Sequence, residues 1–187
     1  MTAQVPDEVF FERGWYSLTA VDGTGLFDPE AHDLEPMTVS SSCWRGHICG
    51  YAVSEGRLLL RDLIIASEDP PPLIRKVVPV RDGDEDDQQW LYQNLEIPVA
   101  FTGRLLIGDG DIKGRPYLNM GFKPAWMYRE VHELTFKAGA LVDAADRSAQ
   151  LAAVRETGPP TQPTAGESTA DWVSRTFSLS YHYSWPT

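Results

Sequence analysis

Residues 47–65 read HICGYAVSEGRLLLRDLII, and this stretch decides the fold class that the sequence predicts. Its first part is rich in β-branched and aromatic residues, which favour strands. Glu55-Gly56 is a short polar break, and the strongly apolar run 57–65 follows it. This arrangement predicts a β-hairpin that turns at residues 54–56.

Strand patterns continue on both sides of this hairpin. Thr38–Cys43 reads as a strand before it, and residues 10–16 read as a small hairpin that turns near Arg13-Gly14. Turn-forming residues at 108–111, 123–124 and 138–139 separate the later strands. The further strands expected from the sequence are 97–107, 117–122, 127–137 and 140–142.

The C-terminal segment 173–185 shows the most regular alternation of apolar and polar residues in the chain. One parity carries Phe177, Leu179, Tyr181, Tyr183 and Trp185, and the other carries mostly Ser and Thr. An extended chain places alternate side chains on opposite faces, so the pattern predicts a returning strand over residues 172–185. This strand would dock into the main sheet with its hydroxyl-rich face outward, or it would pair with a second copy of the protein.

Three segments do not resemble strands, and one of them is the proline run at residues 70–72. Residues 143–157 are expected to form a surface helix capped by Asp143, and residues 158–170, which contain three prolines, a flexible connector. The other strands and turns fit one domain over residues 1–187. The predicted fold is therefore mostly β, an antiparallel sandwich or open barrel with one peripheral helix.

Composition excludes several classes of protein. The 187 residues include 27 acidic and 16 basic side chains, a net charge of −11, which argues against nucleic-acid binding. No apolar run approaches the length of a membrane span, and residues 1–8 have neither the basic start nor the apolar stretch of a secretory signal. Two cysteines are too few for a disulfide scaffold. We therefore expect a cytoplasmic protein that does not interact with membranes.

The charge is concentrated in the first half of the chain. Residues 1–90 hold 17 acidic and 7 basic side chains, and eight of the acids lie within the first 36 residues. A second acidic run must be a solvated loop, because its charges repel one another. Its carboxylates belong to Asp82, Asp84, Glu85, Asp86 and Asp87. Such a run would speed association with a basic partner; the alternative is that it serves solubility alone.

Metal sites are not predicted, and no cofactor is expected. Cys43, His47 and Cys49 include donor atoms that zinc binds, but the Cys-x5-Cys spacing lacks a close pair and a second pair elsewhere. The two cysteines are expected to be free thiols. Residues 109–114 resemble the start of a calcium loop, yet Lys113 and Met120 stand where that loop needs oxygen ligands.

Catalytic motifs are also missing from the sequence: it contains no nucleophile elbow, His-Glu-x-x-His pair or phosphate loop. Glu130 and His132 would share one face of a strand and could form a carboxylate–imidazole pair. Together with Trp126 and Tyr128 they form the alternative site, a ligand pocket or an enzyme centre. An aromatic β core and a solvated sheet face would explain the same residues.

Two stretches resemble a family of uncharacterised bacterial β-rich proteins. The first is a Trp-Arg-Gly-aromatic motif before a hairpin, here residues 43–47 and then 51–60. The second is an aromatic-Thr-Gly strand at 101–107, followed by Met-Gly-aromatic at 120–122 and a final hairpin at 133–139. The chain departs from this pattern at His47 and in the 70–90 insertion. The family has no assigned activity, so the resemblance implies a bacterial β-rich domain and no function.

The leading hypothesis is a non-enzymatic, acidic domain that binds a protein. Its size, its charge and its lack of catalytic motifs suit an immunity-type or inhibitor protein that neutralises a basic bacterial partner. Asp82, Asp84, Glu85, Asp86 and Asp87 are the candidate partner-binding residues. The identity of the partner and the oligomeric state are left open.

Overall fold

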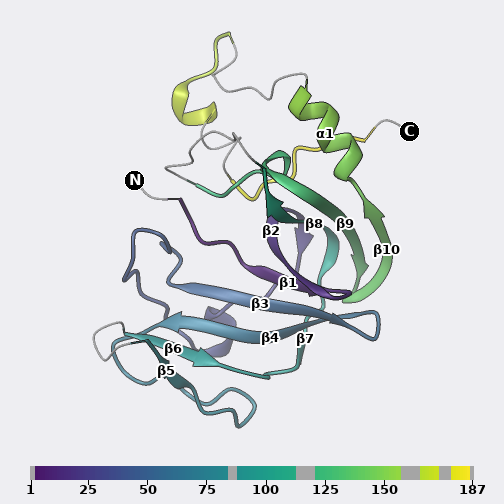
Figure 1. Cartoon of the computed structure of the whole chain (residues 1–187). Helices are drawn as coiled ribbons and strands as arrows, with labels where there is room; N and C mark the ends of the chain where they lie inside the picture. The colour runs from purple at the N-terminus through teal and green to yellow at the C-terminus, as the bar shows by residue number, and fades with distance from the viewer. Residues whose placement is uncertain (1–2, 84–87, 113–120, 157–164, 173–177, 186–187) are drawn as a thin grey trace.

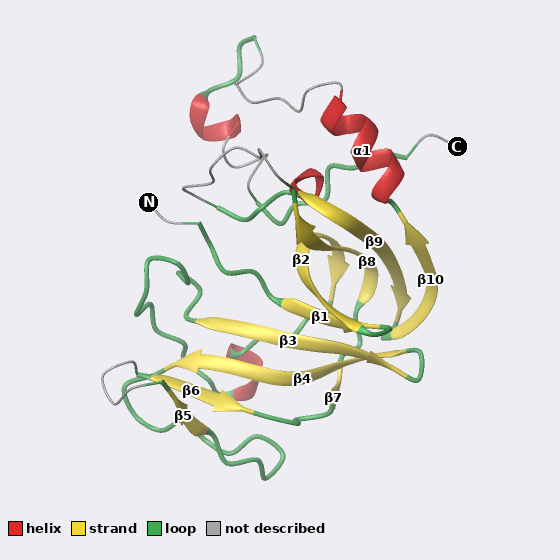
Figure 2. Cartoon of the chain, in the orientation of Figure 1, coloured by secondary structure: helices red, strands yellow, loops and turns green. Residues whose placement is uncertain are grey.

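A computed structural model of the chain describes residues 3–83, 88–112, 121–156, 165–172 and 178–185. It is mostly β, as the sequence predicted, and its ten strands form one sheet with little helix (Figure 2). The strands are β1 (Glu8–Phe11), β2 (Gly14–Thr24), β3 (His47–Ser54), β4 (Arg57–Ala66), β5 (Val80–Asp82), β6 (Gln89–Tyr92), β7 (Ile97–Pro98), β8 (Thr102–Asp111), β9 (Tyr128–Lys137) and β10 (Ala140–Asp146). The helices are the 3-10 turns η1 (Glu30–His32) and η2 (Ala125–Met127) and the α-helix α1 (Ser148–Glu156).

The sheet curls into an open barrel. Its strand order is β10-β9-β8-β2-β1-β3-β4-β6-β5, and β7 also pairs with β4. A single pair, Ala140 with Arg57, joins β10 to β4 and closes a ring of strands from which β6 and β5 extend (Figure 1). Among the pairings of the described strands, β1 with β3 is parallel and the others are antiparallel.

The hairpin expected at residues 10–16 joins β1 to β2, with Phe11 opposite Gly14. Two further tight hairpins lie where the sequence placed them. Residues 55 and 56 turn β3 into β4 with φ angles of 49° and 71°, and residues 138 and 139 turn β9 into β10 with φ angles of 47° and 79°. Two consecutive positive φ angles match the right-handed twist of the paired strands. Both hairpins therefore follow from local turn chemistry.

The main core fills the interior of the barrel. β4 buries Leu58 and Leu60 and then, after a register shift opposite Gly50 and Tyr51, buries Leu63 and Ile65. The shift moves the buried side chains from even-numbered to odd-numbered positions. This explains why the segment is a continuous apolar run in the sequence rather than an alternating one. Large rings complete the core, each contributing roughly 1.5–3 kcal/mol by burial. The fully buried rings are Tyr51, Tyr92, Phe101 and Phe136.

Gly23 and Gly103 allow close contact between β2 and β8. They are opposite each other in the ladder, and a Cβ atom on Gly103 would lie 2.0 Å from the carbonyl oxygen of Asp22. No other residue fits this approach, because the φ angle of Gly103 is 142° and a side chain would overlap the neighbouring backbone.

Several predicted strand and turn boundaries were wrong. Residues 38–43 form a loop with one bridge between Ser40 and Cys43, because serine and threonine hydroxyls bond the backbone there. The strand expected at 97–107 is split into β7 and β8. β8 then continues to Asp111, through the turn expected at 108–111. Most of the strand expected at 117–122 lies outside the described residues.

The helix expected at 143–157 begins at Ser148. Residues 143–146 instead continue β10, since they pair with residues 132–135 of β9 after a bulge between Leu141 and Asp143. Asp146, and not Asp143, then supports the start of the helix, and its Oδ1 accepts a hydrogen bond from the Ser148 backbone nitrogen at 2.8 Å. Part of the expected connector lies outside the described residues, and residues 169–172 form a short helical turn.

The C-terminal segment does not form the regular strand expected at 172–185. Its described part, 178–185, is extended and makes one parallel bridge, between Ser180 and Val21. The predicted alternation is nonetheless present over these residues, with Ser180, His182 and Ser184 exposed and the intervening side chains half-buried. The segment lies with α1 over the outer face of β8 and β9 (Figure 1).

Candidate functional site

An open pocket of about 710 Å³ lies between the segment after β2 and the loop before β3. Four exposed carboxylates line it, contributed by Asp28, Glu30, Asp33 and Glu35. None of them takes part in an ion pair with another described residue. We call this feature the acidic pocket, and Arg45, His47, Leu34 and two prolines complete its lining.

The acidic side of the pocket is held by η1. Asp28 Oδ1 accepts a hydrogen bond from the Glu30 backbone nitrogen at 3.1 Å, which starts the turn after Pro29. Leu34 is 1% exposed and anchors the segment in the main core. The ring of Phe27 stacks on His32 with 4.7 Å between ring centres. The carboxylates therefore sit on a short segment fixed at both ends.

The opposite side of the pocket depends on one buried ion pair. Arg45 donates two hydrogen bonds to Asp7, at 3.0 and 3.1 Å, and the backbone nitrogen of Cys49 donates a third at 2.8 Å. Asp7 is only 5% exposed. Because Asp7 balances the charge of Arg45, the arginine does not neutralise the carboxylates across the pocket.

His47 contributes little positive charge at neutral pH. Burial is the largest effect and lowers the pKa of its imidazole. The hydrogen bond to the Arg45 backbone opposes it, the Arg45 charge lowers the pKa further, and Asp7 and Asp28 raise it slightly. Its Nδ1 lies 3.0 Å from the Arg45 carbonyl oxygen. The acidic pocket is therefore strongly negative.

Exposed apolar side chains adjoin the pocket along the chain. Trp44 precedes Arg45 and is 52% exposed, and Met37 follows Pro36 of the lining. The two loops touch, since a Cβ atom on Gly46 would lie 2.4 Å from the Met37 carbonyl oxygen. Exposed tryptophans beside a charged depression are typical of protein interfaces.

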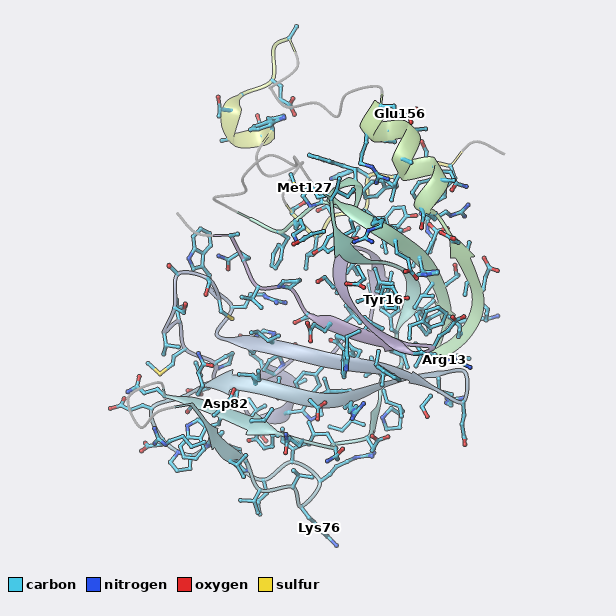
Figure 3. The ribbon with its side chains drawn as sticks, viewed as in Figure 1. Arg13, Tyr16, Lys76, Asp82, Met127 and Glu156 are labelled. Carbon is cyan, nitrogen blue, oxygen red and sulfur yellow. The ribbon has the colours of Figure 1, made fainter. Side chains whose placement is uncertain are left out.

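Asp82, the first residue of the predicted acidic loop, lies at the same end of the sheet as the pocket. Asp82 of β5 pairs with Gln89 of β6, which in turn pairs with Ala66 of β4. The preceding residue of β4, Ile65, pairs with His47 at the start of β3. Three strand spacings separate the ends of β3 and β5, about 15 Å. Figure 3 shows Asp82 at this end. Asp84, Glu85, Asp86 and Asp87 lie outside the described residues.

The four residues of the alternative site lie in two different clusters. Tyr128 is buried in a second apolar cluster outside the barrel, and Trp126 packs against that cluster. His132 instead contacts the rings of Phe11 and Tyr16, and its Nε2 lies 2.9 Å from Glu130 Oε1. The structure therefore brings Glu130 and His132 together but does not join them to Trp126 and Tyr128.

Tyr16 is a third member of the Glu130 and His132 contact, which the sequence did not indicate. Its hydroxyl donates a hydrogen bond of 2.7 Å to Glu130 Oε1. Burial and this hydrogen bond raise the pKa of Tyr16 to about 12. Hydrogen bonds from His132 and Tyr16 lower the pKa of Glu130, so the carboxylate is charged at neutral pH. Tyr16 comes from a different hairpin, 114 residues away in sequence.

Both cysteines are free thiols in the structure. Cys49 is buried, and burial followed by the charge of Asp7 raises its pKa well above the usual value, so it is a poor nucleophile. The Cys43 thiol lies 3.4 Å from the His47 carbonyl oxygen. Over the described ranges, no group of three or more His, Cys, Asp or Glu side chains is arranged to hold a metal ion. Nor does that part of the chain contain a helix with the length and hydropathy to span a membrane.

Comparison of the chain with known protein families, with curated protein sequences and with solved structures finds no match.

Proposed function

We propose that this protein binds a basic protein partner through the acidic pocket, as an immunity-type or inhibitor protein does. The observation that carries the proposal is the convergence of four carboxylates, without a described ion-pair partner, around one open pocket. The position of Asp82 at the same end of the sheet supports it. A basic side chain entering the pocket would be steered by this charge and would gain ion pairs there.

The partner suited to this surface has apolar groups beside its basic residues. Trp44 and Met37 are exposed apolar residues that directly adjoin the pocket residues Arg45 and Pro36 in sequence. Exposed tryptophans supply much of the binding energy in protein interfaces, while charges at the rim mainly set association rate and specificity. We therefore expect the carboxylates to set the association rate and the preference for basic side chains, and the Trp44 side to add apolar binding energy to their contribution.

The test compares two variants that lose the same charge. The pocket variant is Asp28→Asn, Glu30→Gln, Asp33→Asn and Glu35→Gln, which preserves side-chain shape. The control variant neutralises four exposed acids outside the pocket lining, Glu12, Glu55, Asp143 and Glu156. The probe is a labelled peptide rich in Arg and Lys, measured by fluorescence anisotropy at two salt concentrations. We expect affinity to fall about tenfold for the pocket variant and less than about twofold for the control. Equal losses would contradict a localised site.

A second candidate function is acid–base chemistry at Glu130 and His132, and the hydrogen bonds that join Glu130 to both His132 and Tyr16 favour it. The test is hydrolysis of a chromogenic ester by the wild type, His132→Gln and the control His182→Gln, an exposed histidine. Activity lost only in His132→Gln would support this function. The same background rate in all three proteins would contradict it.

A further inference from the structure

The outer face of β2, β8 and β9 carries a second apolar cluster, separate from the main core. Ala20, Leu106 and Val131 point out of the barrel and are fully buried under α1, which inserts Leu151. The C-terminal segment covers the rest of this face with three half-buried rings. These rings belong to Tyr181, Tyr183 and Trp185.

The contacts of this segment converge on Glu133 of β9, which is 4% exposed. Trp185 Nε1 donates a hydrogen bond of 2.7 Å to Glu133 Oε2, and the Tyr181 hydroxyl donates to the same oxygen. Arg147 binds the other oxygen at 2.7 Å, and Arg104 lies 3.7 Å from Oε2. Since a buried carboxylate requires partners, Glu133 selects side chains that carry N–H or O–H donors.

Each of the three aromatic side chains, Tyr181, Tyr183 and Trp185, contacts a different residue on this face. The guanidinium carbon of Arg104 lies 4.3 Å from the ring centre of Tyr181, and that of Arg147 lies 5.0 Å from Trp185. Between them, the Tyr183 hydroxyl accepts a hydrogen bond from the Ala125 backbone nitrogen at 3.1 Å. This spacing is that of an extended peptide recognised through alternate side chains.

The backbone of the segment contributes little to this recognition. One hydrogen bond, from the Val21 nitrogen to the Leu179 oxygen at 2.7 Å, joins it to the edge of β2 in the described part of the chain. Residues 178–185 contain no acidic or basic side chain besides His182. The segment can therefore approach another copy of this acidic protein without adding to the charge repulsion.

We propose that this face is a docking site for an extended peptide of the pattern Tyr-x-Tyr-x-Trp, and that the 178–185 segment of a second copy exchanges with the resident one. A stretch of 21 residues connects Glu156 to Ser178 and could span at most about 75 Å. Exchange of an identical segment through a long connection is the geometry of domain swapping. The resident segment has the advantage of an effective concentration in the millimolar range, so exchange rises with protein concentration.

The first experiment cuts the connection in the full chain. A protease site is inserted after Gly166, where an added Cβ atom would meet no atom within 4 Å. Fluorescence anisotropy then measures a labelled peptide of residues 178–185. We expect the cut protein to bind it at least about tenfold more tightly than the uncut protein, because the resident segment loses its tethered advantage. A control peptide with Tyr181→Phe and Trp185→Phe lacks both donors to Glu133 and should bind about tenfold more weakly.

A cut protein that melts cooperatively and takes up neither peptide would overturn the proposal, as would equal binding of the two peptides. If cutting abolishes cooperative thermal unfolding, the test is instead the oligomeric state of the uncut protein, measured by analytical ultracentrifugation. Exchange predicts a dimer that grows with concentration. Tyr181→Phe with Trp185→Phe should leave the dimer fraction at equilibrium nearly unchanged but speed the interconversion of monomer and dimer, because the same contacts hold the segment in both states. A monomer at every concentration up to about 1 mM would contradict the proposal.

Discussion

Asp7 joins three parts of the chain through one buried carboxylate. It lies just before β1, binds the guanidinium of Arg45 on both oxygens and accepts a hydrogen bond from the Cys49 nitrogen in β3. Its backbone oxygen accepts a further bond from the Leu18 nitrogen in β2. Asp7 therefore positions the loop that carries Trp44, Arg45 and one side of the acidic pocket.

Replacing Asp7 with Ala should lower the free energy of unfolding by about 3–5 kcal/mol, because Arg45 would be left without its buried partner. Urea denaturation followed by circular dichroism measures this change. The control is Asp22→Ala, which removes an exposed ion pair with Arg104 and should cost no more than about 1 kcal/mol. Similar losses in the two variants would show that Asp7 has no special structural role.

At the scale of elements, the junction of β10 and α1 shows how a strand competes with a helix. The backbone groups of residues 143–146 pair with β9, so the helix begins only after this ladder ends. Asp146 accepts the hydrogen bond from the Ser148 nitrogen, and the Ser148 hydroxyl accepts one from the Val131 nitrogen at 3.0 Å. The helix is thereby fixed to β9 at its first residue.

We expect Asp146→Ala to destabilise the protein by about 1 kcal/mol, and the control Asp143→Ala to change its stability by less than about 0.5 kcal/mol. Hydrogen bonds from Ser148 lower the pKa of Asp146. Asp146 therefore stabilises the folded state fully above its ordinary pKa of 3.8. This stabilisation is lost as the pH falls through the lower pKa of the folded protein. Thermal melts at several pH values between 7 and 2.5 measure this: the difference between the two variants should be largest at pH 7 and should shrink as the pH falls. A difference that stays constant over this range would contradict the assignment.

At the scale of the whole molecule, acidic residues far apart in sequence meet at one end of the sheet. The chain carries a net charge of −11, and the acidic pocket and Asp82 lie at the end where β3 begins. Arg45 adds no net charge there because Asp7 balances it. This end of the sheet is therefore negatively charged, which would favour the approach of a basic partner.

Replacing Asp82, Asp84, Glu85, Asp86 and Asp87 with Asn or Gln should leave the melting temperature within about 2 °C of the wild type, since solvated like charges contribute little to folding. Association with the basic peptide probe should become slower and less dependent on salt. Stopped-flow fluorescence measures the rate. A melting temperature lowered by many degrees would mean that these carboxylates have a structural role.

The sequence by itself determined the fold class, three of the hairpins and the alternation of the C-terminal segment. Each of these depends on local chemistry: strand propensity over residues 47–65, positive φ angles at Glu55 and Gly56, and a period of two over residues 178–185. The pairing of Glu130 with His132 also follows from strand spacing alone. Such features need no knowledge of distant partners.

Only the tertiary structure decided which charged residues act together. Among the eight acids near the N-terminus, it buries Asp7 against Arg45 and leaves four others around a pocket. It also places Glu133 where Tyr181 and Trp185, about 50 residues away in sequence, can reach it. The physical reason is that the meeting of such residues depends on strand order and barrel closure, which no short-range pattern of side chains encodes.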